Sequence, residues 1–260
     1  MLGAVACGTR QYRDDSHSPV PLAVNDSRMT MPAAVTTSQL ASAVGLLLAA
    51  YLIGSIPFSL LIARWVGGID LRQHGSGNVG ATNVARTLGL KWGLLALFCD
   101  ALKGLLPTWG LPLVLFDGGA AEGHAQVAAG LAAIVGHMFP CWLGFRGGKG
   151  VATALGVVCV LGWQATLAAF VVFAVVFAAS RIVSLSSMLG DLTFAVAALA
   201  LRWPARFAAG RWSRGAFALA VPALIIFRHR ANIGRLIRGE EARLSRKSAV
   251  DAPEPPGPTA

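Results

Sequence analysis

The sequence predicts an all-α fold, a polytopic membrane bundle of about seven transmembrane helices. Of its 260 residues, 55% are hydrophobic and 13% are charged, whereas a soluble domain carries about 25% charged residues. Its mean hydropathy is +0.62, and several apolar runs approach the roughly 20 residues that cross a bilayer core. Because helices joined by short loops must pack on one another, we expect residues 39–242 to form one membrane domain.

The net charge and the cysteines indicate which partners and cofactors to expect. The formal net charge of +10 fits cytoplasmic loops rich in Lys and Arg beside anionic lipid, so we expect membrane lipids and no nucleic acid as partners. The four cysteines are Cys7, Cys99, Cys141 and Cys159. They lack the C-x-x-C spacing of metal and redox sites, and the last three lie in apolar runs. We therefore expect small buried side chains, no metal ion and no cofactor.

The two ends of the chain differ from its apolar middle. Residues 1–38 mix charges with prolines and serines and lack the features of a signal peptide, so we expect a disordered extension. Met29 and Met31 are alternative translation starts to Met1. Residues 243–260 are basic and then rich in proline, and we expect a disordered tail.

The first expected span, residues 44–63, contains a proline. Pro57 has no backbone donor, so a kink is expected near residues 54–57. Ser55 and Ser59 stand where they can bond the freed carbonyls.

The second expected span, residues 92–116, carries two charges. Asp100 and Lys103 are three residues apart, so they share one helix face and can pair. An unpaired charge at that depth costs about 3 kcal/mol or more, so these side chains are expected to pair or to face a wet cavity. The alternative is an ion pair that only holds the helix in place.

Five further spans are expected, two of them from one long run. Residues 151–180 are about 30 in number, too long for one crossing, so we expect two short helices with a turn at Gly162. The acidic loop at 117–123 belongs outside by the positive-inside rule, which puts the N-terminus outside and the C-terminus in the cytoplasm. The other spans are expected at residues 125–143, 185–201 and 215–227. Four arginines oppose this orientation, because it places them outside: Arg202, Arg206, Arg211 and Arg214.

Residues 75–86, GSGNVGATNVAR, form a polar loop directly after the first span. The literal G-x-G-x-x-G pattern indicates a dinucleotide site only after a strand in a βαβ unit, so we reject that interpretation. Glycines let backbone N–H groups approach an anion, and Arg86 is a bidentate cation suited to phosphate. The alternative is a solvated turn between helices. We predict phosphate binding by Gly75, Ser76, Gly77, Asn78, Gly80, Thr82, Asn83 and Arg86.

Residues 146–150, RGGKG, place a lysine just before a helix expected to begin near Val151. The segment is not a Walker A motif, since Gly150 stands where that motif requires Ser or Thr. A helix N-terminus beside a lysine favours an anion, although a cation that anchors the helix in the cytoplasm is the alternative. We predict phosphate binding by Gly147, Gly148, Lys149 and Gly150.

Two more polar patches stand near expected helix ends. One has serines at a helix start, where serine is often a plain N-cap; the other repeats polar residues at every third position and can line one helix face. Four such patches on one side of a bundle imply a phosphorylated ligand, without separating transport from transfer. The residues are Arg181, Ser184, Ser186 and Ser187 in one patch and His229, Asn232, Arg235 and Glu241 in the other.

These patches, in this order, resemble the bacterial acyl-phosphate:glycerol-3-phosphate acyltransferase family. The matching stretches run from Tyr51 to Glu241: YLIGSIPFSLLIAR, GSGNVGATNVARTLG with Asp100, Lys103 and Pro107, GHMFPCWLGFRGGKGVATALG, RIVSLSS and FRHRANIGRLIRGEE. The resemblance implies transfer of an acyl group from acyl phosphate to the 1-hydroxyl of glycerol-3-phosphate, giving 1-acyl-glycerol-3-phosphate (lysophosphatidate) and phosphate. This is the first acylation of phospholipid synthesis. The resemblance also implies seven helices in the bacterial inner membrane, a site facing the cytoplasm, and a functional link to the enzyme that makes acyl phosphate.

The expected roles follow from this chemistry. Acyl phosphate is already activated, so the task is to bring two phosphates together and to stabilise the oxyanion and the leaving phosphate. We assign Lys149 to the leaving phosphate. The rest of the predicted catalytic set is Ser76, Arg86, Ser186, Ser187, His229 and Asn232, supported by Asp100, Lys103, His137, Arg235 and Glu241. The general base stays open between His137, His229 and a substrate phosphate.

Two other function classes would use the same patches. A transporter of a phosphorylated solute would need an inverted repeat and a polar path through the midplane, and the sequence contains no evident repeat. A non-catalytic membrane subunit is disfavoured by four separate loops suited to phosphate. Acyl-chain preference and oligomeric state stay open.

Overall fold

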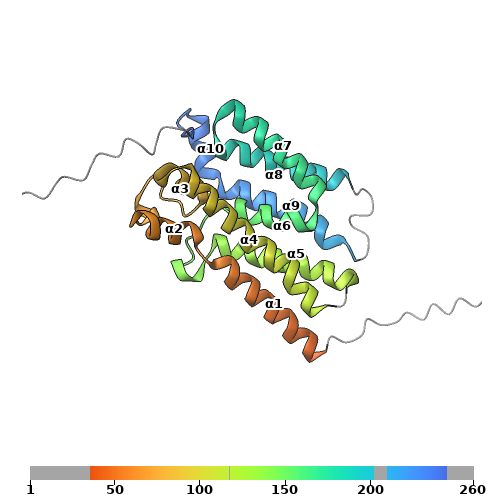
Figure 1. Ribbon diagram of the computed structural model, residues 1–260. Coiled ribbons are helices and arrows are strands. Elements are labelled where there is room, and N and C mark those ends of the chain that lie inside the picture. The colour runs from red at the N-terminus through yellow and green to blue at the C-terminus, as the bar shows by residue number, and fades with distance from the viewer. Residues whose placement is uncertain (1–35, 117, 202–209, 245–260) are drawn as a thin grey trace, which may run out of the picture. The chain divides into compact units, whose positions relative to one another are not determined.

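The computed structural model describes residues 36–116, 118–201 and 210–244 (Figure 1). Within these residues the chain forms ten α-helices, two 3-10 helices and no strand, which confirms the predicted all-α class. Most of the two expected disordered ends lies outside the described residues, as do Cys7, Arg202 and Arg206. Helix α1 begins at Thr37, two residues before the expected start of the membrane domain.

The elements in chain order are α1 (Thr37–Ser55), α2 (Phe58–Gly67), η1 (Leu71–Gln73), α3 (Ala81–Leu88), α4 (Leu90–Leu115), α5 (Gly119–Met138), η2 (Cys141–Leu143), α6 (Val151–Leu161), α7 (Trp163–Ser180), α8 (Val183–Ala200), α9 (Trp212–Arg228) and α10 (Arg230–Ile237). Helix α1 packs on α5, α4 on α6, and α7 on α8 (Figure 1). The short helices α2, α3 and α10 gather at one end of the long helices.

Within the described residues, five segments are long and apolar enough to cross a membrane. They are α1 with α2, α4, α5 with η2, α7 and α8. Helices α9 and α10, which meet at 58°, add a sixth if they form one bent span. Helix α6 is apolar but has 11 residues, short of the roughly 20 that a crossing needs. The total of seven therefore stays a prediction.

The predicted kink at Pro57 is a complete break between α1 and α2. The expected bonds from the two serines to carbonyls are wrong: Ser59 Oγ donates to Asp100 Oδ2 at 3.0 Å, and Ser55 Oγ is buried without a partner among the described residues. The Ile56 carbonyl instead accepts a hydrogen bond from Lys103 Nζ at 2.6 Å. An ammonium is a stronger donor than a hydroxyl, so the charged pair of α4 bonds both sides of the break.

Asp100 and Lys103 pair as predicted, with 2.9 Å between Asp100 Oδ1 and Lys103 Nζ. Their side chains are 2% and 3% exposed. The pair thus faces the interior of the bundle, where its two charges offset each other in a region that disfavours single charges.

Glycines let the helices of the bundle touch backbone to backbone. A Cβ on Gly54 of α1 would collide with the Ala133 carbonyl of α5, and a Cβ on Gly156 of α6 would collide with the Ala101 carbonyl of α4. Lipid tails are as apolar as the side chains that helices bury, so close van der Waals contact carries much of the association energy in a membrane. These crossings hold α1, α5, α4 and α6 together.

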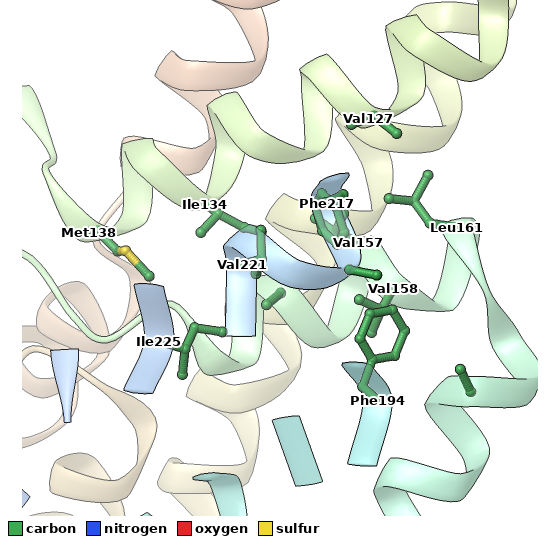
Figure 2. Close-up of a cluster of buried hydrophobic side chains, with 13 residues drawn as sticks. Val127, Ile134, Met138, Val157, Val158, Leu161, Phe194, Phe217, Val221 and Ile225 are labelled. Atoms are coloured by element: carbon green, nitrogen blue, oxygen red, sulfur yellow. The ribbon is translucent and has the colours of Figure 1, made fainter. Parts of the chain in front are cut away.

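The main apolar core lies among α5, α6, α8 and α9 (Figure 2). Ile134 and Val157 are fully buried, and Phe217 is 2% exposed. Phe194 of α8 and Ile225 of α9 extend the same cluster. This core fixes α9, and the last polar patch follows directly, with His229 between α9 and α10 and the other residues on or after α10.

The long run at 151–180 forms two helices, as predicted, with Gly162 between α6 and α7. The expectation of buried cysteines is wrong for Cys159, which is exposed on α6, while Cys99 and Cys141 are half-buried. A thiol behaves as a small apolar group, so an apolar surface tolerates it.

At the other end of the bundle lies Arg214, one of the four arginines that oppose the predicted orientation. Arg214 lies in the first turn of α9 rather than in a loop. Its Nη2 donates to Gln126 Oε1 of α5 at 2.9 Å, and Gln126 Nε2 donates to Glu122 Oε1 at 3.0 Å. Beside this contact, His124 Nδ1 lies 2.6 Å from Ser213 Oγ. We call Glu122, His124, Gln126, Ser213 and Arg214 the far-end network.

Candidate functional site

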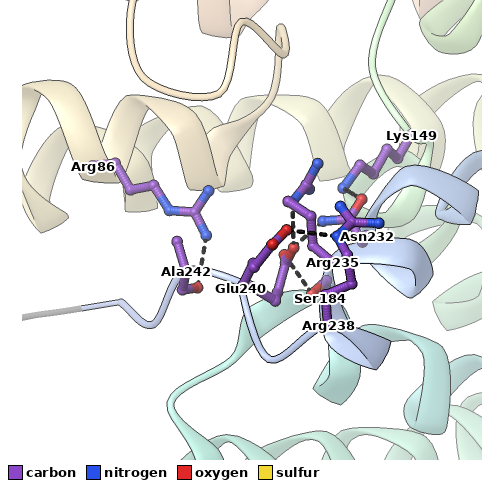
Figure 3. A network of polar contacts seen from close by, with 9 residues as sticks. Arg86, Lys149, Ser184, Asn232, Arg235, Arg238, Glu240 and Ala242 are labelled. Atoms are coloured by element: carbon purple, nitrogen blue, oxygen red, sulfur yellow. Dashed lines mark hydrogen bonds and ion pairs between the residues drawn. The ribbon is translucent and has the colours of Figure 1, made fainter.

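Two of the four predicted patches meet at the carboxylate of Glu241, and Lys149 of a third patch reaches Asn232 beside it (Figure 3). Glu241 Oε1 accepts hydrogen bonds from Ser184 Oγ at 2.8 Å and from Asn232 Nδ2 at 2.6 Å. Its Oε2 accepts one from Arg235 Nε at 2.7 Å. The contacts join the start of α8, the helix α10 and the segment that follows α10. We call Ser184, Asn232, Arg235 and Glu241 the Glu241 hub.

The charge of Glu241 is retained in the hub. Its side chain is 3% exposed, and burial by itself would raise the pKa of Glu241. Hydrogen bonds from Asn232, Ser184 and Arg235 outweigh that effect and lower the pKa below its usual value. Because all three partners donate, the ionised carboxylate fixes their orientation.

Lys149 reaches the hub from the lysine loop, residues 146–150. Its Nζ donates to Asn232 Oδ1 at 2.5 Å. Glu241 accepts a hydrogen bond from the amide nitrogen of Asn232, so the amide oxygen of Asn232 faces Lys149. Burial lowers the pKa of Lys149 to about 8; Glu241 opposes this shift, and nearby arginines add to it. The ammonium is therefore present at neutral pH but easily lost above it.

The lysine loop follows a backbone path that glycine permits. Gly150 precedes α6 with a φ of 88°, in the left-handed region that favours glycine. A Cβ on Gly147 would collide with the His137 carbonyl. Gly147 N donates to the Met138 carbonyl at 3.1 Å, and Gly148 N donates to the His137 carbonyl at 3.2 Å. The loop therefore lies directly on the C-terminal end of α5.

One residue of the site was not predicted. Arg228, the last residue of α9, donates from Nη2 to the Gly148 carbonyl at 2.9 Å and to the Gly147 carbonyl at 3.2 Å. It stands beside His229 in the FRHR stretch, but no local pattern shows that its partner lies 80 residues away. Arg228 therefore holds the lysine loop by two of its backbone carbonyls.

Arg86 lies on α3 and contacts the end of the described chain. Its Nη2 donates to the Ala242 carbonyl at 3.1 Å, and Figure 3 shows the two residues beside each other. Leu244 N donates to the Arg181 carbonyl at 2.8 Å. The segment after α10 thus connects the glycine loop (residues 75–86) with the start of α8.

Asn83, in the first turn of α3, is 1% exposed, and its amide bonds backbone groups of the chain that precedes α3. Asn83 Oδ1 accepts from Ser76 N at 2.9 Å, and Asn83 Nδ2 donates to three backbone carbonyls, those of Leu71, His74 and Asn78. These bonds shape the turn that presents the loop. Ser76 is exposed, and Thr82 and Asn78 are half-buried.

The serines of the third patch differ in their contacts. Ser184 bonds to Glu241 in the hub, whereas Ser186 Oγ donates to the Ile182 carbonyl one turn earlier at 2.8 Å. Ser187 is 5% exposed. The alternative that these serines are plain N-caps is wrong, because the N-cap of α8 is Ile182 and no side chain caps it.

The two candidate bases have different surroundings. His229 is 2% exposed and joins α9 to α10, with Nδ1 2.8 Å from the Ile225 carbonyl. A carbonyl only accepts, so the neutral ring carries its proton on Nδ1 and leaves Nε2 as an acceptor. His137 is 6% exposed, and its ring packs against Gly148 below the lysine loop.

Comparison with known proteins places this arrangement in a family. The family model described as glycerol-3-phosphate acyltransferase matches residues 44–239. The glycerol-3-phosphate acyltransferase of Myxococcus xanthus is 48% identical over 198 residues, 76% of this chain and 97% of the relative. That of Aquifex aeolicus is 42% identical over 198 residues, 76% and 97% of the two chains. The chain belongs to the glycerol-3-phosphate acyltransferase family.

Solved structures agree with this membership. The crystal structure of PlsY, an integral membrane glycerol 3-phosphate acyltransferase, in its glycerol 3-phosphate form matches with a TM-score of 0.68 and 42% identity, over 78% of this chain and 95% of that chain. The lysophosphatidic acid form matches with a TM-score of 0.66 and 40% identity, over 80% and 98%. The predictions of an integral membrane helical bundle and of an acyltransferase are thus confirmed.

Proposed function

We propose that the protein transfers an acyl group from acyl phosphate to the 1-hydroxyl of glycerol-3-phosphate, the first acylation of phospholipid synthesis. The products are 1-acyl-glycerol-3-phosphate and phosphate. The observation that carries the proposal is the contact of Lys149 with the Glu241 hub, beside Arg86 and Arg228, in a chain of this family. Relatives solved with the acceptor and with lysophosphatidic acid support the acceptor and the product.

The proposed step exchanges one oxygen substituent on the acyl carbon. The 1-hydroxyl oxygen attacks the acyl carbonyl carbon, the carbonyl electrons move onto oxygen, and the bond from that carbon to the phosphate oxygen breaks as the carbonyl reforms. The hydroxyl proton passes to a base or to a phosphate. Because the donor is activated, fixed cations and donors at the oxyanion and the leaving phosphate supply most of the catalysis.

The proposed roles follow from the charges of the site. Lys149 stabilises the leaving phosphate, and Arg86, with its flat guanidinium, binds a second phosphate in two places. Asn232 and Ser76 contribute neutral donors, whereas His229, whose Nδ1 bonds the Ile225 carbonyl, presents Nε2 as an acceptor. Ser184 and Arg235 act through Glu241, which they hold in place.

The base is proposed to be a substrate phosphate rather than His137, whose ring is turned toward Gly148. His229 is the rival, since its Nε2 is free to accept when Nδ1 bonds the Ile225 carbonyl. The variant His229→Gln decides between them. Substantial residual turnover supports the substrate as base, and loss of turnover with unchanged substrate affinity supports His229.

We also propose the orientation and surroundings expected from the sequence: N-terminus outside, seven spans counting α6, and the site at the cytoplasmic face of the bacterial inner membrane. The cations around the Glu241 hub favour that face. Acyl phosphate is reactive, so an enzyme that makes it is expected to work with this protein. Labelling of single introduced cysteines from either side of sealed vesicles tests the orientation.

The direct test uses purified protein in detergent with acyl phosphate. Phosphate release that depends on added glycerol-3-phosphate supports the proposal. Folded wild-type protein that releases no phosphate, or that releases it at the same rate with and without the acceptor, contradicts it. Accumulation of glycerol-3-phosphate in vesicles without acylation would favour the transporter hypothesis.

A further inference from the structure

We propose that Asp100, Lys103 and His137 form a buried brace that sets the position of the lysine loop, and with it the position of Lys149. As positioning residues they would act on the proposed acyl transfer, on which this inference rests. They lie below the loop, within the bundle, and their action would pass through its backbone.

The brace begins at the break between α1 and α2. Lys103 Nζ donates to the Ile56 carbonyl, and Ser59 Oγ donates to Asp100 Oδ2. Each ion of a pair loses its hydration on burial, and apolar side chains of similar size often hold helices at least as well. If the pair only anchored α4, apolar side chains would serve equally well. The two buried charges therefore indicate a further role.

His137 connects the ion pair to the lysine loop. Its Nδ1 lies 3.8 Å from Asp100 Oδ1, and the other edge of its ring is so close to Gly148 that a Cβ there would collide with Nε2. The imidazole thus stands between the carboxylate and the loop. The backbone bond from Gly148 N to the His137 carbonyl adds a second connection between them.

One small cavity brings these groups together. It has room for about one water molecule and lies where the break, α4, α5 and the lysine loop meet. Val79 brings the glycine loop to the same place. The lining residues are Ser55, Pro57, Ser59, Val79, Asp100, Lys103, His137, Pro140, Leu143, Gly147 and Gly148.

The position of Gly148 determines where Lys149 points. Lys149 follows Gly148 directly and must reach Asn232 Oδ1 at 2.5 Å. Arg228 also bonds the Gly147 and Gly148 carbonyls of this loop, so the loop is held by a cation as well as packed on the brace. A misplacement of a catalytic group by about 1 Å can lower a rate about 100-fold. Loss of the brace should therefore change catalysis without changing any group that touches the substrate.

The charges make a specific pattern of variants. Asp100→Asn or Lys103→Met alone leaves one buried charge without its partner, which is strongly destabilising. The double variant Asp100→Asn/Lys103→Met removes both charges, so it should fold better than either single variant. The double variant still lacks the hydrogen bond from Lys103 to the Ile56 carbonyl, and it lacks the Asp100 carboxylate beside His137.

The test combines amide hydrogen exchange with kinetics on full-length protein in detergent. In the double variant we expect exchange at Gly147 and Gly148 to increase about tenfold or more, and kcat/KM for acyl transfer to fall about 10- to 100-fold. Exchange in α7 should stay unchanged. Asp191→Asn, which changes a half-buried carboxyl with one buried oxygen, in α8, is the control and should keep wild-type loop exchange.

Wild-type loop exchange and kinetics in a folded double variant would overturn the brace. If the double variant does not fold, His137→Gln tests the brace instead. This variant removes the ring under Gly148 and leaves the Asp100–Lys103 ion pair intact. Faster loop exchange in His137→Gln supports the brace, and unchanged exchange overturns it. Hydrogen exchange does not depend on turnover. An inactive wild-type protein would therefore contradict the proposed function, while the exchange data would still test the brace.

Discussion

The two ends of the helical bundle both hold polar side chains, but they differ in charge balance. In the far-end network, Arg214 bonds Gln126 and Gln126 bonds Glu122, so one cation, one anion and neutral groups complete each other's contacts. At the site end, Lys149 stands among three further cations, Arg235, Arg86 and Arg228, and one carboxylate, that of Glu241. Polar groups that only join helices are satisfied by the protein. An excess of one charge indicates a ligand of the opposite charge.

The largest expected effect is the loss of Lys149. We predict that Lys149→Ala lowers kcat at least about 100-fold, the usual result of removing one fixed donor from a developing charge. Arg86→Ala should have a similar effect. Phosphate release by folded, monodisperse protein measures both. Near-normal turnover in either variant would contradict the assignment.

The counter-charge of the hub gives the next effect. Glu241→Gln should lower the pKa of Lys149 below about 8, because Glu241 raises that pKa. The fall of activity at high pH should then begin at lower pH than in the wild type. The pH profile of kcat/KM shows the shift. A profile that stays in place would mean that Glu241 does not act on the lysine charge.

The wild-type pH dependence is a smaller effect. The pKa of Lys149 is about 8, so its cation is largely present below pH 8 and is lost as the pH rises through that value. We expect kcat for acyl transfer to fall above about pH 8, as the leaving phosphate loses this cation. Lys149→Arg is the control, since its guanidinium does not titrate in this range. A fall of the same size in that variant would assign the effect to another group.

The smallest expected effect on catalysis lies at the far end. Arg214→Gln should lower the Tm by ~2–4 °C, the shift expected for about 1 kcal/mol, and leave kcat and KM within about twofold. Thermal unfolding and the phosphate-release assay measure the two quantities. A loss of turnover comparable with that of Lys149→Ala would mean that the two ends are not functionally separate.

Local features of the sequence were enough for most of the helices and for the patches. Pro57 and Gly162 break helices where the sequence predicts, and Asp100 and Lys103 pair because a helix brings i and i+3 together. These outcomes depend on neighbours in the chain. The sequence also predicted that Asn232 and Arg235 share a face, and both bond Glu241.

Contacts between distant segments were not predictable in the same way. Arg228 holds the lysine loop, and Arg86 bonds the Ala242 carbonyl, but nothing near these residues shows the partner. Asn83 lies on α3, and its amide turns inward to bond the carbonyls of Leu71 and His74, which the sequence around it does not show. Arg214 was expected in a loop, because its bond to Gln126 depends on how α5 and α9 pack.

A product balance tests the proposed acyl transfer most directly. Purified protein is incubated with acyl phosphate and glycerol-3-phosphate, and both products are measured, phosphate by a colorimetric assay and lipid by mass spectrometry. We expect one 1-acyl-glycerol-3-phosphate for each phosphate released, with both products lost in Lys149→Ala and both retained in Arg214→Gln. Phosphate release without an acylated product, or turnover that survives Lys149→Ala, would contradict it.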